Sequence, residues 1–180
     1  MFVVVVLSLH VVQKNYDPIN QLMSELVFGP YGSMMIFAFI GLAFAVFGMA
    51  IELMYCSAGL GLRVLLWAVS VCFLLAGLFP LGKNIEVHIA SVALAFIFMI
   101  LAIYLFPVAA GQASRLAPKS LSWTLAVCVA VCVALGNQMI PMGVGQRLAA
   151  FFLLLWLTIV SWRLWRGGEG ARDGDVRCNL

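Results

Sequence analysis

The feature that most constrains this chain is a series of long apolar runs, separated by short stretches rich in polar residues, glycine or proline. A helix needs about 20 apolar residues to cross the roughly 30 Å hydrocarbon core of a bilayer. Six runs are candidate spans when the short first run is included: Met1–Val12, Ser33–Met54, Val64–Phe79, Val87–Phe106, Leu121–Met139 and Leu148–Trp165. The sequence therefore predicts an all-α, polytopic transmembrane helical bundle of six spans.

The composition excludes several classes of protein. Of the 180 residues, 65% are hydrophobic and 9% are charged, whereas an ordinary soluble domain is about 45–50% apolar and about 25% charged. A soluble fold of this length has no interior large enough to hide so much apolar surface. The net charge of +3 is dispersed along the chain and too small for a polyanion-binding surface. A soluble enzyme, a disordered chain and a nucleic-acid binder are excluded, which leaves membrane lipids and other integral membrane subunits as partners.

The first run is too short for a complete span. A helix over Met1–Val12 extends only about 18 Å at 1.5 Å per residue. The run also lacks the basic region and the small-residue cleavage site of a secretory signal. It is either a half-span or the end of a span that begins upstream of Met1, and we favour the second interpretation.

The loop charges predict the orientation. Alternate loops place seven basic residues on one side of the membrane and three on the other: Arg63, Arg115, Lys119, Arg163, Arg166, Arg172 and Arg177, against Lys14, Lys83 and Arg147. Cytoplasmic loops carry the excess of Lys and Arg, so the first side is predicted to be cytoplasmic, together with both termini. Residues 1–165 then form a single transmembrane domain, and residues 166–180 a flexible cytoplasmic tail.

A short non-spanning helix is predicted between the first two runs. Asp17-Pro18 has the pattern of an N-cap followed by proline at the first helical position, and Gly29-Pro30 that of a stop. Between them, apolar residues recur at helical spacing: Ile19, Leu22, Met23, Leu26 and Val27. We expect an amphipathic helix in the outer interface, with Ser24 and Glu25 on its polar side.

Polar residues near membrane depth collect at the outer end. Seven of them form the candidate site, which we call the outer polar cluster: His10, Asp17, Ser24, Glu25, Glu86, His88 and Arg147. Lys83, Asn137 and Gln138 fall at the same end. Polar and ionisable groups inside a membrane are costly and usually mark a function or a mutual pairing. A site in this chain is therefore expected to open outward.

The chemistry of the outer polar cluster stays open at this stage. Ser24, His88 and either Glu25 or Asp17 have the residue types of a nucleophile, a base and an orienting group, but no G-x-S-x-G elbow positions them. His10, His88 and a carboxylate are residue types suited to a metal with an open position, but no H-x-x-x-H or H-E-x-x-H spacing accompanies them. No metal and no cofactor is predicted. For Arg147 we favour a structural ion pair with Glu25, Glu86 or Asp17 over a catalytic role.

Several short motifs resemble a known family. They are His10, Tyr16-Asp17-Pro18, Ser24-Glu25-Leu26, Gly29-Pro30-Tyr31-Gly32, Gly77-Leu78-Phe79-Pro80, His88, Gly145-Gln146-Arg147 and Leu155-Trp156-Leu157. In order and spacing they are similar to a prokaryotic family of six-span membrane proteins known as domain of unknown function 998. The resemblance covers nearly the whole chain and implies a six-helix bundle in a prokaryotic inner or cell membrane, with no established activity.

The chain departs from the pattern of this family in two places. The family usually has an acidic residue after the Phe-Pro pair, where this chain has Leu81-Gly82-Lys83. That difference argues against acid-dependent chemistry at this point. The first span of the family is normally complete, which agrees with a start upstream of Met1.

Three functions compete on the sequence alone. We favour a non-enzymatic accessory or structural subunit, or an assembly partner, of a larger membrane complex, because no catalytic motif is evident. The alternative is an outward-facing lipid- or headgroup-binding protein, or a membrane-embedded enzyme, that uses the His, Arg, Glu and Ser side chains of the outer polar cluster. A transporter is the weakest hypothesis, because the spans are nearly uniformly apolar in their middles and show no repeat.

Overall fold

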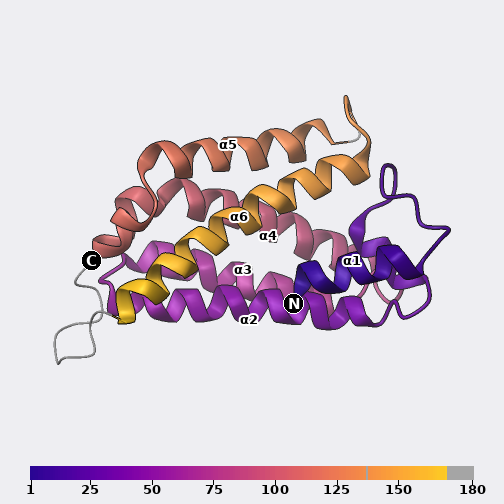
Figure 1. The fold of residues 1–180 in the computed structure, drawn as a ribbon, viewed down its shortest axis with the longest axis horizontal. Coiled ribbons are helices and arrows are strands. Elements are labelled where there is room, and N and C mark those ends of the chain that lie inside the picture. The colour runs from indigo at the N-terminus through magenta and orange to yellow at the C-terminus, as the bar shows by residue number, and fades with distance from the viewer. Residues whose placement is uncertain (137, 170–180) are drawn as a thin grey trace.

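The computed structural model describes residues 1–136 and 138–169, and these ranges fold into a bundle of helices. The α-helices are α1 (Phe2–Val12), α2 (Met34–Tyr55), α3 (Leu60–Leu78), α4 (Ile85–Ala109), α5 (Lys119–Leu135) and α6 (Met142–Glu169), and the 3₁₀ helices are η1 (Met23–Phe28) and η2 (Gly111–Leu116). The long helices run side by side along the long axis of the molecule (Figure 1). Each predicted apolar run coincides largely with one of these helices, although α5 ends at Leu135, before the predicted end of its run at Met139. The all-α bundle is confirmed.

Within the described residues, four helices are long and apolar enough to cross a membrane: α2, α3, α4 and α6. The helices α1 and α5 are apolar but shorter, with 11 and 17 residues. The chain is therefore a multi-pass integral membrane protein, whereas the count of six spans and the cytoplasmic position of the termini stay predictions. The helix α6 continues to Glu169, and the rest of the predicted tail, residues 170–180, lies outside the described residues.

The surface of the bundle is apolar, as a lipid-facing surface must be. Large apolar side chains are exposed on several helices, including Val4 (66%), Phe44 (68%) and Val108 (65%). A soluble monomer rarely exposes a large continuous apolar surface. These side chains are expected to contact lipid.

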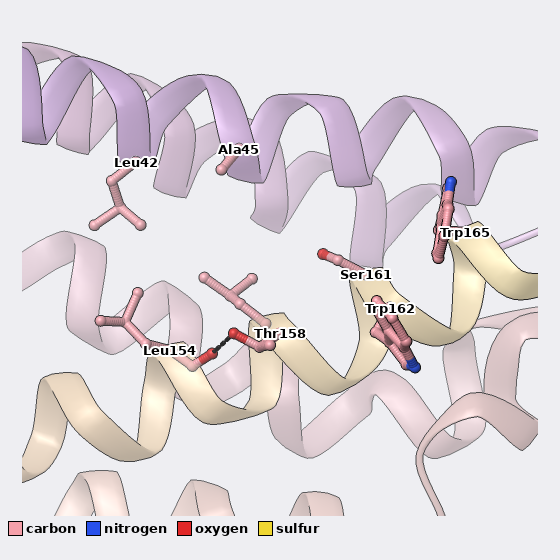
Figure 2. Close-up of a pocket in the computed structure, with 8 residues that line it drawn as sticks. Leu42, Ala45, Leu154, Thr158, Ser161, Trp162 and Trp165 are labelled. Atoms are coloured by element: carbon pink, nitrogen blue, oxygen red, sulfur yellow. Dashed lines mark hydrogen bonds between the residues drawn. The ribbon is translucent and has the colours of Figure 1, made fainter. Parts of the chain in front are cut away.

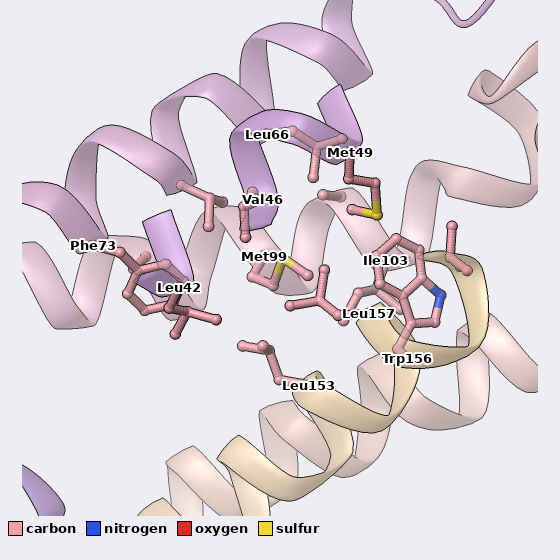
Figure 3. Packing of buried hydrophobic residues seen from close by; sticks show 14 of the residues in the cluster. Leu42, Val46, Met49, Leu66, Phe73, Met99, Ile103, Leu153, Trp156 and Leu157 are labelled. Atoms are coloured by element: carbon pink, nitrogen blue, oxygen red, sulfur yellow. The ribbon is translucent and has the colours of Figure 1, made fainter. Parts of the chain in front are cut away.

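The core lies where α2, α3, α4 and α6 pack together (Figure 3). Leu66 comes from α3, Met99 and Ile103 from α4, and Trp156 from α6, and all four are fully buried. The Trp156 ring packs edge-on against Phe106 with the ring centroids 5.1 Å apart. Its indole N–H donates to the buried Ser122 hydroxyl of α5 at 3.3 Å, so the polar atom of this aromatic anchor is satisfied.

The helix α1 covers only part of α2. Phe2 packs edge-on against Phe39 with the centroids 6.0 Å apart, and the Met1 side chain lies against Gly41, partway along α2. Beyond this level α2 and α6 border a groove of about 530 Å³ (Figure 2). We call it the α2/α6 groove, and its lining residues are Leu42, Ala45, Leu154, Leu157, Thr158, Ser161, Trp162 and Trp165.

The predicted amphipathic α-helix between α1 and α2 is wrong. Residues 18–21 form a turn, and only Met23–Phe28 form a helix, of the 3₁₀ type. Asp17 makes an Asx-type turn, in which its carboxylate accepts from the backbone N–H of Ile19 at 2.9 Å and from the side-chain amide of Asn20 at 2.6 Å. Ser24, expected on the polar face, is buried, and Ile19, expected on the apolar face, is exposed. Packing against α6 overrides the 3.6-residue pattern here.

Candidate functional site

The loop of residues 13–33 folds over the first turns of α6. The backbone N–H of Val144 donates to the Ile19 carbonyl at 3.2 Å. The backbone N–H of Met23 donates to the side-chain carbonyl of Gln146 at 2.7 Å. At the other end of the loop, the buried side chain of Gln13 donates to the carbonyls of Leu26 and Pro30 at 2.8 and 2.9 Å. The loop is thus held by hydrogen bonds at its middle and at its end.

Arg147 is the centre of this attachment. One of its terminal nitrogens, Nη1, donates to the carbonyls of Gln21 at 3.0 Å and Gly143 at 2.8 Å. The other, Nη2, donates to His10 Nε2 at 3.1 Å and to the Tyr16 hydroxyl. The guanidinium therefore joins α1, the loop and α6 through charge-assisted hydrogen bonds.

The contacts of His10 determine its tautomer. Its Nδ1 lies 2.6 Å from the Val6 carbonyl, an acceptor, so Nδ1 carries the proton. Its Nε2 then presents a lone pair, which accepts from Arg147. The ring packs edge-on against Tyr16 with the centroids 5.0 Å apart. Both ring nitrogens of His10 therefore make hydrogen bonds, and the ring contacts Tyr16.

The acidic residues of the outer polar cluster do not pair with Arg147, so the predicted ion pair is wrong for the described residues. Glu25 accepts from the backbone N–H of Leu22 at 2.9 Å and from the Gln21 side chain at 3.4 Å. Asp17 is committed to its own turn, where the hydrogen bond from Asn20 lowers the pKa of its carboxyl. Glu86 is exposed in the first turn of α4. Backbone carbonyls and neutral rings satisfy Arg147 in place of carboxylates.

Tyr16 connects the loop to Arg147, and the pKa of its hydroxyl is raised. Its hydroxyl accepts from Arg147 and faces the carbonyls of Leu22 at 2.9 Å and Gln21 at 3.2 Å. Burial raises the pKa of Tyr16 above its usual 10.0, against the opposing effect of Arg147. The folded state therefore holds the phenol proton more tightly than the unfolded state does.

We expect this difference in pKa between the folded and unfolded states to make the contact between the loop and Arg147 sensitive to alkali. Since the folded pKa is raised, the stability it contributes is complete below the unfolded pKa of about 10 and is lost as the pH rises above it. Unfolding midpoints of the wild type and of Tyr16→Phe, measured in detergent from about pH 8 to about pH 11, are expected to converge as the pH increases. A constant difference across that range would contradict the assignment.

A second group of polar residues borders a separate cavity. The buried His88 faces the carbonyls of Ala76 at 3.0 Å and Phe79 at 3.1 Å with its Nδ1. Two acceptors place the proton on Nδ1, so Nε2 presents a lone pair. That Nε2 is buried and has no hydrogen-bond partner among the described residues. Unsatisfied buried polar atoms are uncommon and need an explanation.

The cavity beside His88 is a groove of about 250 Å³ between α4, α5, α6 and the loop. We call it the His88 groove, lined by Leu22, Ser24, His88, Ile89, Val92, Ala93, Phe96, Cys132, Val133, Gly136, Met142 and Gln146. Apolar side chains at its edge are exposed, among them Ile89 (52%) and Val133 (46%). Its wall is therefore polar at Ser24, His88 and Gln146 and apolar toward the lipid-facing surface.

Gln146 is a site residue that the outer polar cluster did not include, although it belongs to the Gly145-Gln146-Arg147 motif. Its Oε1 accepts from the Met23 N–H, which leaves its amide N–H₂ as the donor end. The same residue lines the His88 groove and the adjoining cavity of about 30 Å³. Its position directly before Arg147, at the outer end of the last predicted span, was the sequence feature that could have indicated a role in the site.

The structure thus divides the outer polar cluster. His10 and Arg147 form the loop attachment, Ser24 and His88 line the His88 groove, and the three acidic residues belong to neither contact set. Asn137 lies outside the described residues. Within residues 1–136 and 138–169, no group of three or more His, Cys, Asp or Glu side chains is placed to hold a metal ion.

The comparisons with known proteins give one match. A family model described as "Protein of unknown function (DUF998)" matches residues 1–163. No curated protein and no solved structure matches the chain. The family model covers most of the sequence, including both the loop attachment and the His88 groove. The chain therefore belongs to the DUF998 family of proteins of unknown function.

Proposed function

We propose that this protein binds a membrane lipid in the His88 groove. The observation that carries the proposal is the buried Nε2 of His88, which has no partner among the described residues and belongs to a side chain lining the groove. A buried polar atom without a partner costs about 1–3 kcal/mol. A ligand that donates a hydrogen bond to Nε2 would recover that free energy, and the apolar remainder of the groove suits an acyl chain.

The polar groups of the groove indicate the chemistry of the lipid. His88 Nε2 can accept a hydrogen bond, and the amide N–H₂ of Gln146, whose Oε1 already accepts from Met23, can donate one. A lipid with a hydroxyl or N–H next to an ester or amide carbonyl satisfies both. Its chain would lie along Ile89, Val92 and Phe96.

A phosphate headgroup is less well suited, because the nearby arginine is already occupied. Arg147 uses both terminal nitrogens on Gln21, Gly143, His10 and Tyr16. Lys83 is exposed and does not line the groove. Among the described residues that line the groove, none has a cationic side chain, so we propose a neutral polar end for the lipid.

Blocking the groove tests the proposal. Ala93 is exposed and lines the groove, so Ala93→Phe is expected to fill it without removing a polar group. Ala90→Phe adds the same bulk to an exposed position of α4 outside the lining. Native mass spectrometry after gentle extraction is expected to show a bound neutral lipid in the wild type and in Ala90→Phe, and at least tenfold less in Ala93→Phe. Equal lipid retention in all three proteins would overturn the proposal.

An accessory-subunit role is the second candidate, and the α2/α6 groove favours it. Ala45, Thr158 and Ser161 line this groove of about 530 Å³ with small or hydroxyl-bearing side chains. Such side chains allow close approach of helices in a membrane and hydrogen bonds between them. The helix of a partner subunit would fit this surface. The same native mass spectra distinguish the two candidates, since a stoichiometric protein partner without bound lipid would favour the subunit role.

A further inference from the structure

We propose that Ser24 is an acyl-accepting nucleophile and that His88 is its general base. The inference rests on the proposed lipid binding in the His88 groove and adds a reaction to it. Ser24 is 4% exposed and His88 is 2% exposed, and the buried His88 Nε2 has no hydrogen-bond partner among the described residues. A serine hydroxyl beside a histidine nitrogen with a free lone pair has the residue types of a nucleophile and its base.

The two residues border the same spaces. Both line the His88 groove, and both also line a smaller cavity of about 10 Å³. A space of that size holds about one water molecule. A proton can pass from a hydroxyl to a base directly or through one water molecule. The arrangement therefore suits proton transfer from Ser24 to His88.

The orientation of His88 is that of a general base. The carbonyls of Ala76 and Phe79 hold the Nδ1 proton and fix the ring. In the familiar serine triad a carboxylate performs this task, and here two backbone carbonyls take its place. Glu25 and Asp17, the orienting groups suggested by the sequence, are engaged with Leu22 and with Ile19. The site is thus a Ser–His pair oriented by backbone.

The proposed reaction is acyl transfer from a lipid ester. The Ser24 oxygen attacks the ester carbonyl carbon while its proton moves to His88 Nε2, and the C=O electron pair moves onto the carbonyl oxygen, where the Gln146 amide N–H donates. The C–O bond to the lipid alcohol then breaks, and that alcohol leaves with the proton from His88. Water or a second alcohol attacks the acyl-serine with the same proton transfer, which releases the acyl group and restores Ser24.

A serine-directed probe tests this assignment. The full chain, purified in detergent, is incubated with an alkyl fluorophosphonate, and the modified peptide is identified by mass spectrometry. We expect the phosphonyl group on Ser24, no label there in Ser24→Ala, and about 100-fold slower labelling in His88→Gln, since a general base contributes about 10²–10⁴-fold. Ser91→Ala is the matched control, because Ser91 is a buried serine of α4 outside the lining of these cavities.

The outcomes separate this inference from the proposed function. If the wild type retains lipid but Ser24 is not labelled, the nucleophile assignment is wrong and lipid binding stands. If His88→Gln retains lipid and is labelled at the wild-type rate, His88 is not the base. If Ser24 is labelled but no lipid is retained, the reaction is supported and stable lipid binding is not. Lipid retention by each variant also shows that the groove is intact.

Discussion

Replacing Gly143 by alanine is expected to detach the loop of residues 13–33 from α6. A Cβ at this position would lie 2.5 Å from the Gln21 carbonyl oxygen, 2.6 Å from that of Ile19 and 2.7 Å from that of Pro18. These atoms belong to backbone and cannot rotate away. Overpacking commonly costs about 1–3 kcal/mol, and we expect the upper part of that range here, because three contacts are violated together.

Gly48→Ala is the matched control for this substitution. Gly48 lies on an exposed face of α2, and a Cβ there meets nothing within 4 Å. Alanine favours a helix over glycine by about 0.5–1 kcal/mol. Thermal unfolding in detergent is therefore expected to show a lower midpoint for Gly143→Ala and an unchanged or higher one for Gly48→Ala. Equal midpoints for Gly143→Ala and the wild type would show that α6 and the loop are not in close contact.

The second large effect is expected for Arg147→Gln. The substitution removes the charge and most of the donors that reach Gln21, His10 and Tyr16. Hydrogen bonds to charged groups contribute about 1.5–3 kcal/mol, and acceptors left unpaired add a penalty of their own. Since Arg147 is only half-buried, water compensates in part, and we expect a loss of about 2–3 kcal/mol.

Hydrogen–deuterium exchange locates this effect. Faster exchange is expected at the backbone N–H groups of Met23 and Val144, which bond across the contact between the loop and α6. Lys83→Gln removes an exposed cation near the start of α4 and is expected to leave exchange and unfolding unchanged. If both substitutions destabilised the protein equally, net charge and not the hydrogen-bond set would be responsible.

The loop attachment and the His88 groove are coupled through η1. Ser24 lines the groove and follows Met23, whose N–H fixes the side chain of Gln146. Arg147 comes directly after Gln146 and holds the preceding part of the loop. Arg147 is thus a positioning residue, so its substitution is expected to weaken lipid retention without a direct contact to the lipid.

The sequence predicted the helices well because apolar runs of this length have few alternatives. In a bilayer every backbone N–H and C=O group needs an internal partner, and a helix supplies one within the segment. Length and hydropathy therefore predicted α2, α4 and α6 without knowledge of their neighbours. The order of the spans also predicted that polar residues such as His10, His88 and Arg147 lie at the same end of the bundle. The family resemblance stated from the short motifs was confirmed by the match over residues 1–163.

Only the tertiary structure decided how the polar residues divide. Residue types suggested that Arg147 pairs with a carboxylate, but the loop brings the Gln21 carbonyl, His10 and Tyr16 to it. The periodicity of Ile19–Val27 suggested an α-helix, but packing on α6 buries Ser24 and leaves Ile19 exposed. Backbone carbonyls and long-range contacts carry no signature in a single sequence. The apolar runs therefore determined the helices, and contacts between distant segments determined the site.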